Sequence, residues 1–459
     1  MTVSGTPGTG TITLSAASSG YQSFATAYGA NATVDILIEE GTAWEVARDC
    51  TYTNSGTTVT RGTLEASSTG SAVSFTSAAV VSEIATATKG TWHEVQLRSV
   101  IPGGRLTLES GVPVSTTDQT AKTTIYYTPF VHNVINLWDG ANWVPTEFTE
   151  TSLALGTLIA SRTYDVFGYL DAGALVLESL GWASSTVTIT IASPGVVSWT
   201  AHGHENGDSI VFATTGSLPT GLTAGTTYYV VNKATDTFQL AAVSAGTAIN
   251  TTGSQSGTHT AYSQDVRGTA VTLQDGRYCK SGDKTRLLLG TFFTATTTTT
   301  ESSLSKRFLD NVYNRVALKL FKSTSTVTWT YATATWRAAN ADSTYRVQIV
   351  RSIPSLASVS YVGGANALGS GRYGYVGVGV NTTATRSDDT NARIGWYAGS
   401  PPAGQEVEGQ ATATIKHYAP AGVTYYQAVE YVDGGANVRF FGDFGDNRIV
   451  TGLIGECNA

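Results

Sequence analysis

The amino-acid sequence predicts an all-β protein made of several antiparallel β-sandwich or jelly-roll-like domains. Charged residues make up only 13% of the 459 residues, where about a quarter is typical of globular proteins. Forty-nine glycines, 22 tyrosines and long Thr/Ser/Ala tracts take their place. β-Branched and aromatic residues favour pleated strands, and glycine marks turns and bulges. No repeat of fixed period runs through the chain, so solenoids and propellers are not expected.

Length and charge restrict the class of protein further. The chain has room for about three domains, each with its own core. A net charge of −7 argues against a basic face for nucleic acid. No apolar run is long enough for a membrane span, and the first residues lack the features of a signal peptide. We therefore expect synthesis in a cytoplasm, without export by the usual route and without membrane insertion.

The three cysteines, Cys50, Cys279 and Cys457, lie far apart and form no CxxC motif. Their spacing favours free thiols buried as small apolar groups. A disulfide between subunits is the alternative.

The N-terminal part divides into two segments. Residues 1–20 are rich in Thr, Ser and Gly, which predicts an arm that is ordered only against a partner. Residues 21–120 are expected to form a β domain that attaches the chain to another protein. Its strands begin near Val34, Trp44 and Thr57, and turn residues bound each run. Residues 74–87 fit either a strand or a short helix.

The middle of the chain reads as a domain interrupted by another. Residues 121–190 and 263–351 form the two halves of the split β domain, and residues 191–262 form the inserted module. Four short strands in the insertion predict a small sandwich or barrel. The polar turns near residues 184–190 and 262–268 are suitable cut points. If they are, Trp182 and Val271 should lie close together.

The last part is expected to be a C-terminal β-sandwich over residues 352–459, because its strands alternate cleanly between apolar and polar residues. Residues 304–321 are ambiguous. Leu309, Val312 and Val316 share a helical spacing, but their β-branched and aromatic neighbours fit a buried strand as well.

Several motifs carry a resemblance to a known class of protein. The insertion, with Trp199-Thr-Ala-His-Gly-His-Glu-Asn-Gly-Asp208 and Leu218-Pro-Thr-Gly-Leu-Thr-Ala-Gly, resembles a β module of bacteriophage tail fibres and other virion proteins. The split block is similar to a recurrent phage virion-protein block through Leu273-Gln-Asp-Gly, Arg286-Leu-Leu-Leu-Gly-Thr and Lys306-Arg-Phe-Leu-Asp-Asn-Val-Tyr-Asn-Arg315. The resemblance covers the chain from residue 125 onward.

The resemblance implies a structural component of a tailed-phage virion, made in the host bacterial cytoplasm. It implies an elongated homotrimeric fibre or spike that binds other virion proteins through its N-terminal region and contacts a host cell-surface glycan. The uncharged Thr/Gly/Tyr composition also suits β surfaces buried between copies. The alternative is a capsid-decorating head fibre, or a baseplate or collar component, that binds only virion proteins. A glycan-degrading tail spike is a further alternative.

No motif predicts an enzyme, a cofactor or a metal site. The chain lacks a Gly-x-Ser-x-Gly elbow, a Walker loop and a His-Glu-x-x-His motif. The tripeptide that starts at Asp443 matches the kinase Asp-Phe-Gly but has no companion motifs, which favours a turn. His202 and His204 have a spacing that could bind a metal, yet they lie in a predicted turn. Four carboxylates for glycan cleavage are expected in solvated turns: Asp388, Asp389, Glu406 and Glu408.

Aromatic residues near the C-terminal end are the remaining candidates for a site. Aromatic faces beside polar turns suit the stacking of sugar rings. The candidate glycan or receptor contacts are Trp396, Tyr397, Tyr418, Tyr425 and Tyr426. Core packing or a contact between subunits is the alternative for residues on alternating strands.

Overall fold

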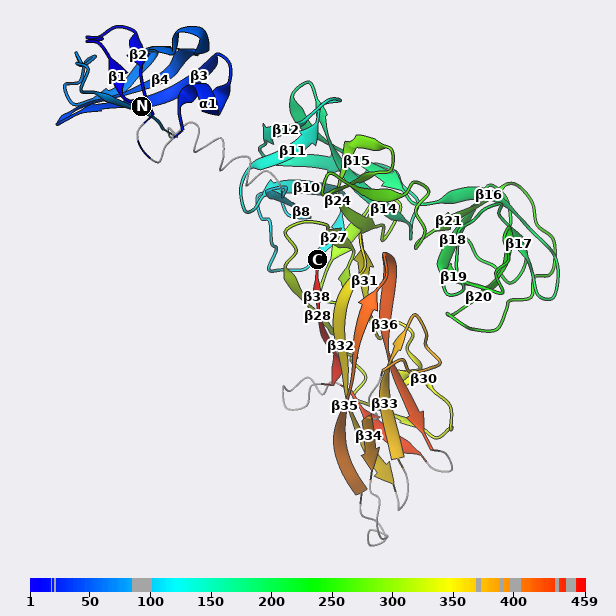
Figure 1. The fold of residues 1–459 in the computed structure, drawn as a ribbon. Helices are drawn as coiled ribbons and strands as arrows, with labels where there is room; N and C mark the ends of the chain where they lie inside the picture. The colour runs from blue at the N-terminus through cyan, green and yellow to red at the C-terminus, as the bar shows by residue number, and fades with distance from the viewer. Residues whose placement is uncertain are drawn as a thin grey trace. The chain divides into compact units, whose positions relative to one another are not determined.

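In the computed structural model, the regular secondary structure is almost entirely β-strand, which confirms the all-β prediction (Figure 1). It describes residues 1–17, 19, 22–84, 101–368, 373–388, 392–395, 406–433, 437–442 and 451–459. Helical structure within these ranges is limited to α1 (Phe24–Tyr28) and the 3-10 turns η1 (Asn54–Gly56) and η2 (Ala339–Ala341). None of the described helices has the length and apolarity needed to cross a bilayer. The chain divides into two compact units, residues 1–97 and 98–459.

The first unit is built on one antiparallel sheet in the order β1-β2-β5-β4-β3-β7, with β6 added to β4. Its strands are β1 (Val3–Ser4), β2 (Ile12–Leu14), β3 (Ala32–Glu40), β4 (Ala43–Thr53), β5 (Thr58–Thr60), β6 (Thr63–Ser67) and β7 (Val80–Glu83). Of the ambiguous residues 74–87, the structure therefore forms a strand at residues 80–83. Residues 85–87 lie outside the described part of the chain.

The first residues belong to this sheet and do not form the separate arm expected for residues 1–20. β2 pairs with β5, and β1 pairs with β2. Ile12 and Leu14 are buried in the same core as Val34 and Ile36 of β3. The arm prediction was wrong because a single short apolar alternation is enough to fill the gap that the longer strands leave in this core.

The second unit begins with small sheets and hairpins that precede the barrel. β8 (Gly104–Thr107), β10 (Thr124–Pro129) and β13 (Thr151–Ala154) form one sheet, and β11 (Val134–Trp138) pairs with β12 (Trp143–Glu147). A larger sheet has the order β15-β14-β24-β23-β22, with β27 paired to β24. Its strands are β14 (Thr163–Asp171), β15 (Ala174–Gly181), β22 (Val271–Gln274), β23 (Arg277–Lys280), β24 (Asp283–Phe293) and β27 (Leu309–Asn311).

A closed barrel occupies the residues between β15 and β22, and Figure 1 shows it beside the larger sheet. Its strands are β16 (Ser184–Ile189), β17 (Val197–Ser198), β18 (Ser209–Thr214), β19 (Thr227–Val231), β20 (Thr237–Ala241) and β21 (His259–Ser263). Trp199, Phe212, Phe238 and Leu240 are among the side chains that fill it. Closure leaves the barrel without exposed sheet edges.

The chain enters and leaves the barrel at one place. The Ala183 N–H donates to the Val266 carbonyl at 3.0 Å, and the Ser263 N–H donates to the Ala183 carbonyl at 2.8 Å. The Arg267 guanidinium lies 4.4 Å from the centre of the Trp182 ring. β15, which ends one residue before Trp182, and β22, which starts at Val271, are the two outermost strands of their sheet. The expected proximity of Trp182 and Val271 stays a prediction.

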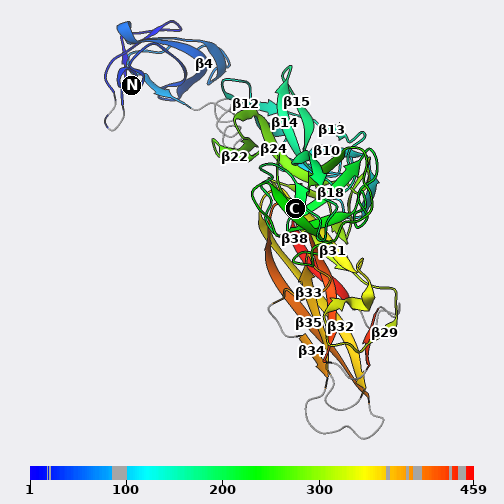
Figure 2. The same cartoon turned by 90° about the vertical axis from the view of Figure 1, so that its right-hand side faces the viewer.

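Two facing sheets form the C-terminal part (Figure 2). One has the order β34-β33-β36-β31-β26-β25-β9, with β30 paired to β36; the other has the order β28-β38-β32-β37-β29, with β35 paired to β32. The first comprises β9 (Gln119–Lys122), β25 (Thr300–Ser302), β26 (Lys306–Arg307), β30 (Arg337–Ala338), β31 (Arg346–Arg351), β33 (Tyr373–Val380), β34 (Ala392–Gly395) and β36 (Gly422–Val432). The second comprises β28 (Ala317–Lys322), β29 (Thr328–Tyr331), β32 (Ser355–Leu368), β35 (Glu406–Ala419), β37 (Val438–Phe441) and β38 (Gly452–Asn458).

Both sheets mix strands from before and after residue 351, where the sequence suggested a boundary. β31 and β36 pair in the first sheet, and β28 pairs with β38 in the second. The ambiguous residues 304–321 form three short strands, β26, β27 and part of β28, with non-strand residues at 312–316, so neither a helix nor one continuous buried strand is observed. One core, which includes Tyr345, Val359 and Phe440, lies between the two sheets. The three cysteines are free and buried, as expected.

Candidate functional site

Of the predicted aromatic contacts, the three that the structure describes, Tyr418, Tyr425 and Tyr426, do not form one exposed site. Tyr418 lies on β35 and is 67% exposed. It stands directly opposite Leu356 of β32, which is 51% exposed. Trp396 and Tyr397 lie outside the described residues. Tyr418 is thus the one member of the predicted set that the structure places at the surface.

Tyr425 and Tyr426 are buried on β36 and hold parts of the chain together. The Tyr425 ring packs against Tyr229 of the barrel, with 6.5 Å between ring centres. The Arg346 guanidinium lies 4.6 Å from the centre of the Tyr425 ring. The Tyr426 hydroxyl lies 3.1 Å from Nδ1 of His417. Neither ring offers a face to a sugar in this chain, because both faces of β36 are covered.

An open sheet face surrounds Tyr418. We call the outer surface of β28, β38, β32 and β35 the open face. Rows of paired residues cross its four strands, and every second side chain along β32 and β35 points outward. One row consists of Lys319, Glu456, Ser358 and Lys416, and the next consists of Phe321, Ile454, Ser360 and Thr414. The open face therefore combines apolar, hydroxyl and charged side chains.

The outer surface of the opposing sheet is covered by the chain itself. Tyr431 of β36 packs on Trp336 and Tyr375, with ring centres 5.4 and 5.6 Å apart. The Arg386 guanidinium lies 5.9 Å from the Trp336 ring. Among the described residues, the open face is therefore the less covered of the two outer surfaces.

The two histidines of the barrel are buried among aromatic rings. Nε2 of His202 lies 2.9 Å from the Ala234 carbonyl, and its Nδ1 accepts the His204 N–H at 2.9 Å. His204 packs against Trp199 and Phe238. Burial lowers the pKa of His204 to about 4, and the neighbouring His202 adds to the effect. Among the residues that the structure describes, no group of three or more His, Cys, Asp or Glu side chains is placed to hold a metal ion.

The carboxylates considered for glycan cleavage are not all solvated. Asp388 is buried, accepts the Val378 N–H at 2.8 Å and lies 3.6 Å from the Arg386 guanidinium. The expectation of a solvated turn was wrong for this residue, whose carboxylate anchors a loop to β33. Glu408 is exposed on β35. Asp389, the side chain of Glu406 and Asp443 lie outside the described residues.

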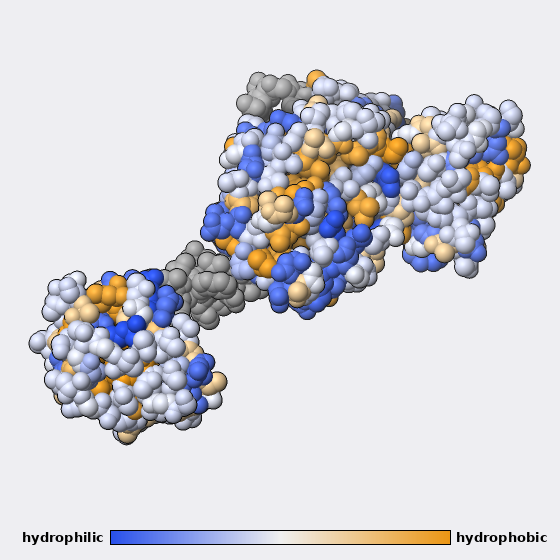
Figure 3. Space-filling view, turned by 90° about the horizontal axis from the view of Figure 1, so that it is seen from above, coloured by the Kyte–Doolittle hydropathy of each residue, from blue (hydrophilic) through white to orange (hydrophobic). Residues whose placement is uncertain are grey.

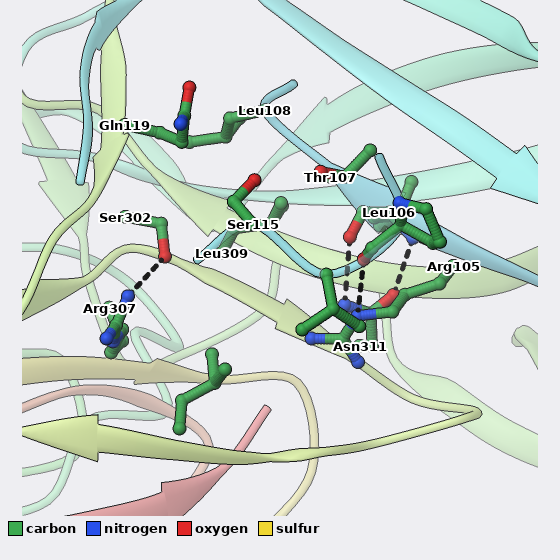
Figure 4. A pocket seen from close by; sticks show the side chains of 13 residues that line it. Arg105, Leu106, Thr107, Leu108, Ser115, Gln119, Ser302, Arg307, Leu309 and Asn311 are labelled. Carbon is green, nitrogen blue, oxygen red and sulfur yellow. Dashed lines mark hydrogen bonds between the residues drawn. The ribbon is translucent and has the colours of Figure 1, made fainter. Parts of the chain in front are cut away.

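A small polar pocket lies where β8, β9, β25, β26 and β27 meet (Figure 4). Its volume is about 30 Å³, and its polar lining includes Arg105, Thr107, Ser115, Gln119, Ser302 and Arg307. Figure 4 shows the two arginines on different sides of the pocket. Burial lowers the pKa of Arg105 to about 10 and also lowers the pKa of Arg307. We call this cavity the arginine pocket.

Sequence reasoning missed both the open face and the arginine pocket. Arg105 and Arg307 are about two hundred positions apart and belong to no recognisable motif. The alternation along β32 and β35 marks one outward side for each strand. The alternation does not show whether other parts of the chain cover that outward side.

Comparison with known proteins gives little further information. A scan against protein-family models finds no matching family, and a search of curated proteins finds no match. Among solved structures, the chain shows similarity to infectious bursal virus derived T=1 particles at 10% identity. This comparison covers 77% of this chain and 72% of that chain, with a TM-score of 0.14. A likeness at that TM-score carries no argument about function.

Proposed function

We propose that this chain is a non-enzymatic structural component of a tailed-bacteriophage virion that assembles as a homotrimeric fibre or spike. Its N-terminal region attaches to other virion proteins, and its later domains contact a host cell-surface glycan. The observation that carries the proposal is the open face. The trimeric state and the place in a virion come from the sequence resemblance.

The chemistry of the open face suits contact with other copies of the same chain. Leu356 and Tyr418 form an exposed apolar pair at one end of it. Glu456 is the direct neighbour of Lys319 in one row. Lys416 lies in the same row, on the other side of Ser358. A surface with both signs of charge can complement itself across a symmetric assembly. Burial of the apolar pair would supply the hydrophobic part of the interface.

The remaining surface agrees with close packing between copies. Much of the surface in Figure 3 is pale, the colour of residues that are neither strongly polar nor strongly apolar. This follows from the low charged fraction of 13% and the abundance of Thr, Ser and Gly. Such surfaces lose few solvated charges when they are buried against another copy.

The mass in solution tests the assembly. We expect the full chain to have three times its 48.0 kDa chain mass by light scattering. Leu356→Asp combined with Tyr418→Asp should convert it to a monomer without loss of strand signal in circular dichroism. Leu273→Asp is the matched control, because Leu273 is 62% exposed on β22, away from the open face. A monomeric wild-type chain would refute the assembly, and a trimer that survives the double substitution would refute this interface.

Labelling of intact particles tests the place in the virion. An antibody against residues 360–459 should mark the tail, and purified full chain should compete with phage for adsorption to host cells. Label around the capsid with no competition would favour the head-fibre alternative. Release of sugar from host polysaccharide by the purified chain would overturn the non-enzymatic role.

A further inference from the structure

The arginine pocket contains two buried cations without a carboxylate partner. Arg105 and Arg307 are 4% and 9% exposed. Arg105 donates to the carbonyls of Pro113 at 3.0 Å and Asn314 at 2.8 Å. Arg307 donates to the Lys319 carbonyl at 2.8 Å and to the Ser302 hydroxyl at 3.3 Å. Within the described ranges, no acidic side chain comes within ion-pair distance of either guanidinium.

Other arginines with little exposure pair with a carboxylate. The fully buried Arg351 and the partly buried Arg61 and Arg267 have a carboxylate oxygen at 3.2, 3.0 and 2.6 Å respectively. A buried charge is costly unless it is paired, and carbonyl oxygens supply only part of the compensation. Arg105 and Arg307 have no such partner among the described residues, and they line one cavity.

Three acidic residues around the pocket form hydrogen bonds or ion pairs with other groups. Asp310 acts on Arg105 from a distance, but its carboxylate is bound by Arg315 at 3.1 Å and Arg351 at 3.2 Å. Asp118 acts on Arg307 in the same way and accepts the Leu304 N–H at 2.8 Å. Glu109 accepts from the Gln119 amide at 3.1 Å. Only Asp310 is neutralised by its partners, but no acidic side chain lines the pocket, so the charges that a bound molecule would meet first are the two guanidinium groups.

The pocket also has a suitable size and a free hydroxyl. A volume of about 30 Å³ corresponds to about two water molecules on the scale where one needs ~10–15 Å³. This space takes about two oxygens of a compact oxyanion, whose remaining oxygens point toward the opening, and it cannot enclose a nucleotide or a sugar phosphate. The Ser115 hydroxyl has no hydrogen-bond partner among the described residues, and Ser115 is only half-buried, so the pocket is reachable from solvent.

We propose that the arginine pocket binds a small tetrahedral oxyanion, inorganic phosphate or sulfate, between Arg105 and Arg307. Planar guanidinium groups and a hydroxyl are the donors that such an anion takes in proteins. A bound anion would join the segment from Arg105 to Gln119 to the strands β25 and β26. This inference does not depend on the proposed function.

The full chain tests the proposal through phosphate-dependent stability. At constant ionic strength, we expect the urea midpoint to rise with inorganic phosphate and to saturate in the millimolar range or below. The phosphorus resonance of inorganic phosphate should also broaden when the chain is added. Both responses should disappear in a variant that combines Arg105→Gln and Arg307→Gln.

A second variant keeps the test informative if the double substitution does not fold. Ser115→Asp places a carboxylate in the pocket, so we expect a higher midpoint without phosphate and no response to it. Ser185→Asp, at a half-buried serine of the barrel, is the matched control and should keep the wild-type response. Phosphate at high concentration stabilises proteins in general, so an equal, unsaturated rise in all variants would overturn the proposal. A lower midpoint for Ser115→Asp with an unchanged phosphate response would overturn it as well.

Discussion

At the scale of single residues, Arg267 holds the junction between the barrel and the rest of the second unit. Its guanidinium forms two bonds with Asp165 of β14, at 2.6 and 2.9 Å. It also donates to the Ser352 carbonyl at 2.7 Å and covers the buried Trp182 ring. One side chain therefore ties together the strand before the barrel, the exit from it and the C-terminal sheets.

Asp165→Asn should be strongly destabilising, because it leaves the largely buried Arg267 guanidinium without its counter-charge. We expect a loss of about 3–5 kcal/mol in the free energy of unfolding, measured with urea. Asp171→Asn, at the exposed end of the same strand, is the control and should change stability little. A small effect of Asp165→Asn would show that the pair does not hold the junction.

Asp265 makes the same junction sensitive to pH. Its carboxylate accepts the Ser209 N–H and hydroxyl at 2.6 Å and the Val423 N–H at 3.2 Å. Burial, with a smaller effect of Asp208, raises the pKa of Asp265 from 3.8 to about 7. Since the folded-state pKa is above the unfolded one, the folded chain retains this proton longer. The stabilising contribution is complete below about pH 4 and is lost as the pH rises through about 7.

Asp265→Asn cannot titrate and should remove this part of the pH dependence. We expect the stability of the wild type relative to the variant to fall by about 2 kcal/mol between pH 4 and pH 8, after a discount for partial solvent access. Urea unfolding at a series of pH values measures the difference. Parallel curves for the two proteins would contradict the assignment.

At the scale of elements, local turn chemistry could be predicted well from the sequence. The sequence Asp171-Ala-Gly173 is typical of a tight turn, and Asp171 pairs with Ala174 across a two-residue loop. Ala172 has φ 46° and Gly173 has φ 83°, the left-handed values that a type I′ turn requires. Glycine adopts this backbone freely, whereas alanine is strained there.

Ala172→Asn should therefore stabilise the hairpin, since Asn-Gly is a preferred pair for this turn. We expect a gain of about 1 kcal/mol in the free energy of unfolding. Ala174→Asn, two positions later on the exposed side of β15, should give no gain. Equal effects at both positions would show that the backbone conformation is not the cause.

Elements that depend on distant partners could not be predicted in the same way. The alternation in residues 352–459 indicated strands, but β28 and β31 join the same two sheets from before residue 351. The short strands β1 and β2 have too little pattern to identify alone, and the core of their sheet stabilises them. For the candidate site, sequence reasoning found Tyr418 but also selected Tyr425 and Tyr426. Whether an outward side of a strand stays exposed depends on what else covers it.

At the scale of the whole molecule, the two compact units have separate cores. Ile36 belongs to the core of residues 1–97, and Ile349 belongs to the core between the two C-terminal sheets. No buried side chain of the described residues is shared between the two cores. We therefore expect at least two transitions in calorimetry of the full chain.

Ile36→Ala should lower one transition alone, because deletion of a fully buried aliphatic side chain costs about 2–5 kcal/mol in the core that loses it. Ile349→Ala should lower another transition and leave the first unchanged. A shift of all transitions by either substitution would show that the units unfold together.

The closed junction of the barrel has a mechanical consequence. Ala183 is bonded to both Ser263 and Val266, so a pulling force along the chain crosses from one side of the barrel to the other through this clamp. Arg267 and Asp165 carry part of the same load. The barrel strands remain unloaded until the clamp breaks. When the chain is stretched, we therefore expect the barrel to begin to open at this clamp and not within its interior.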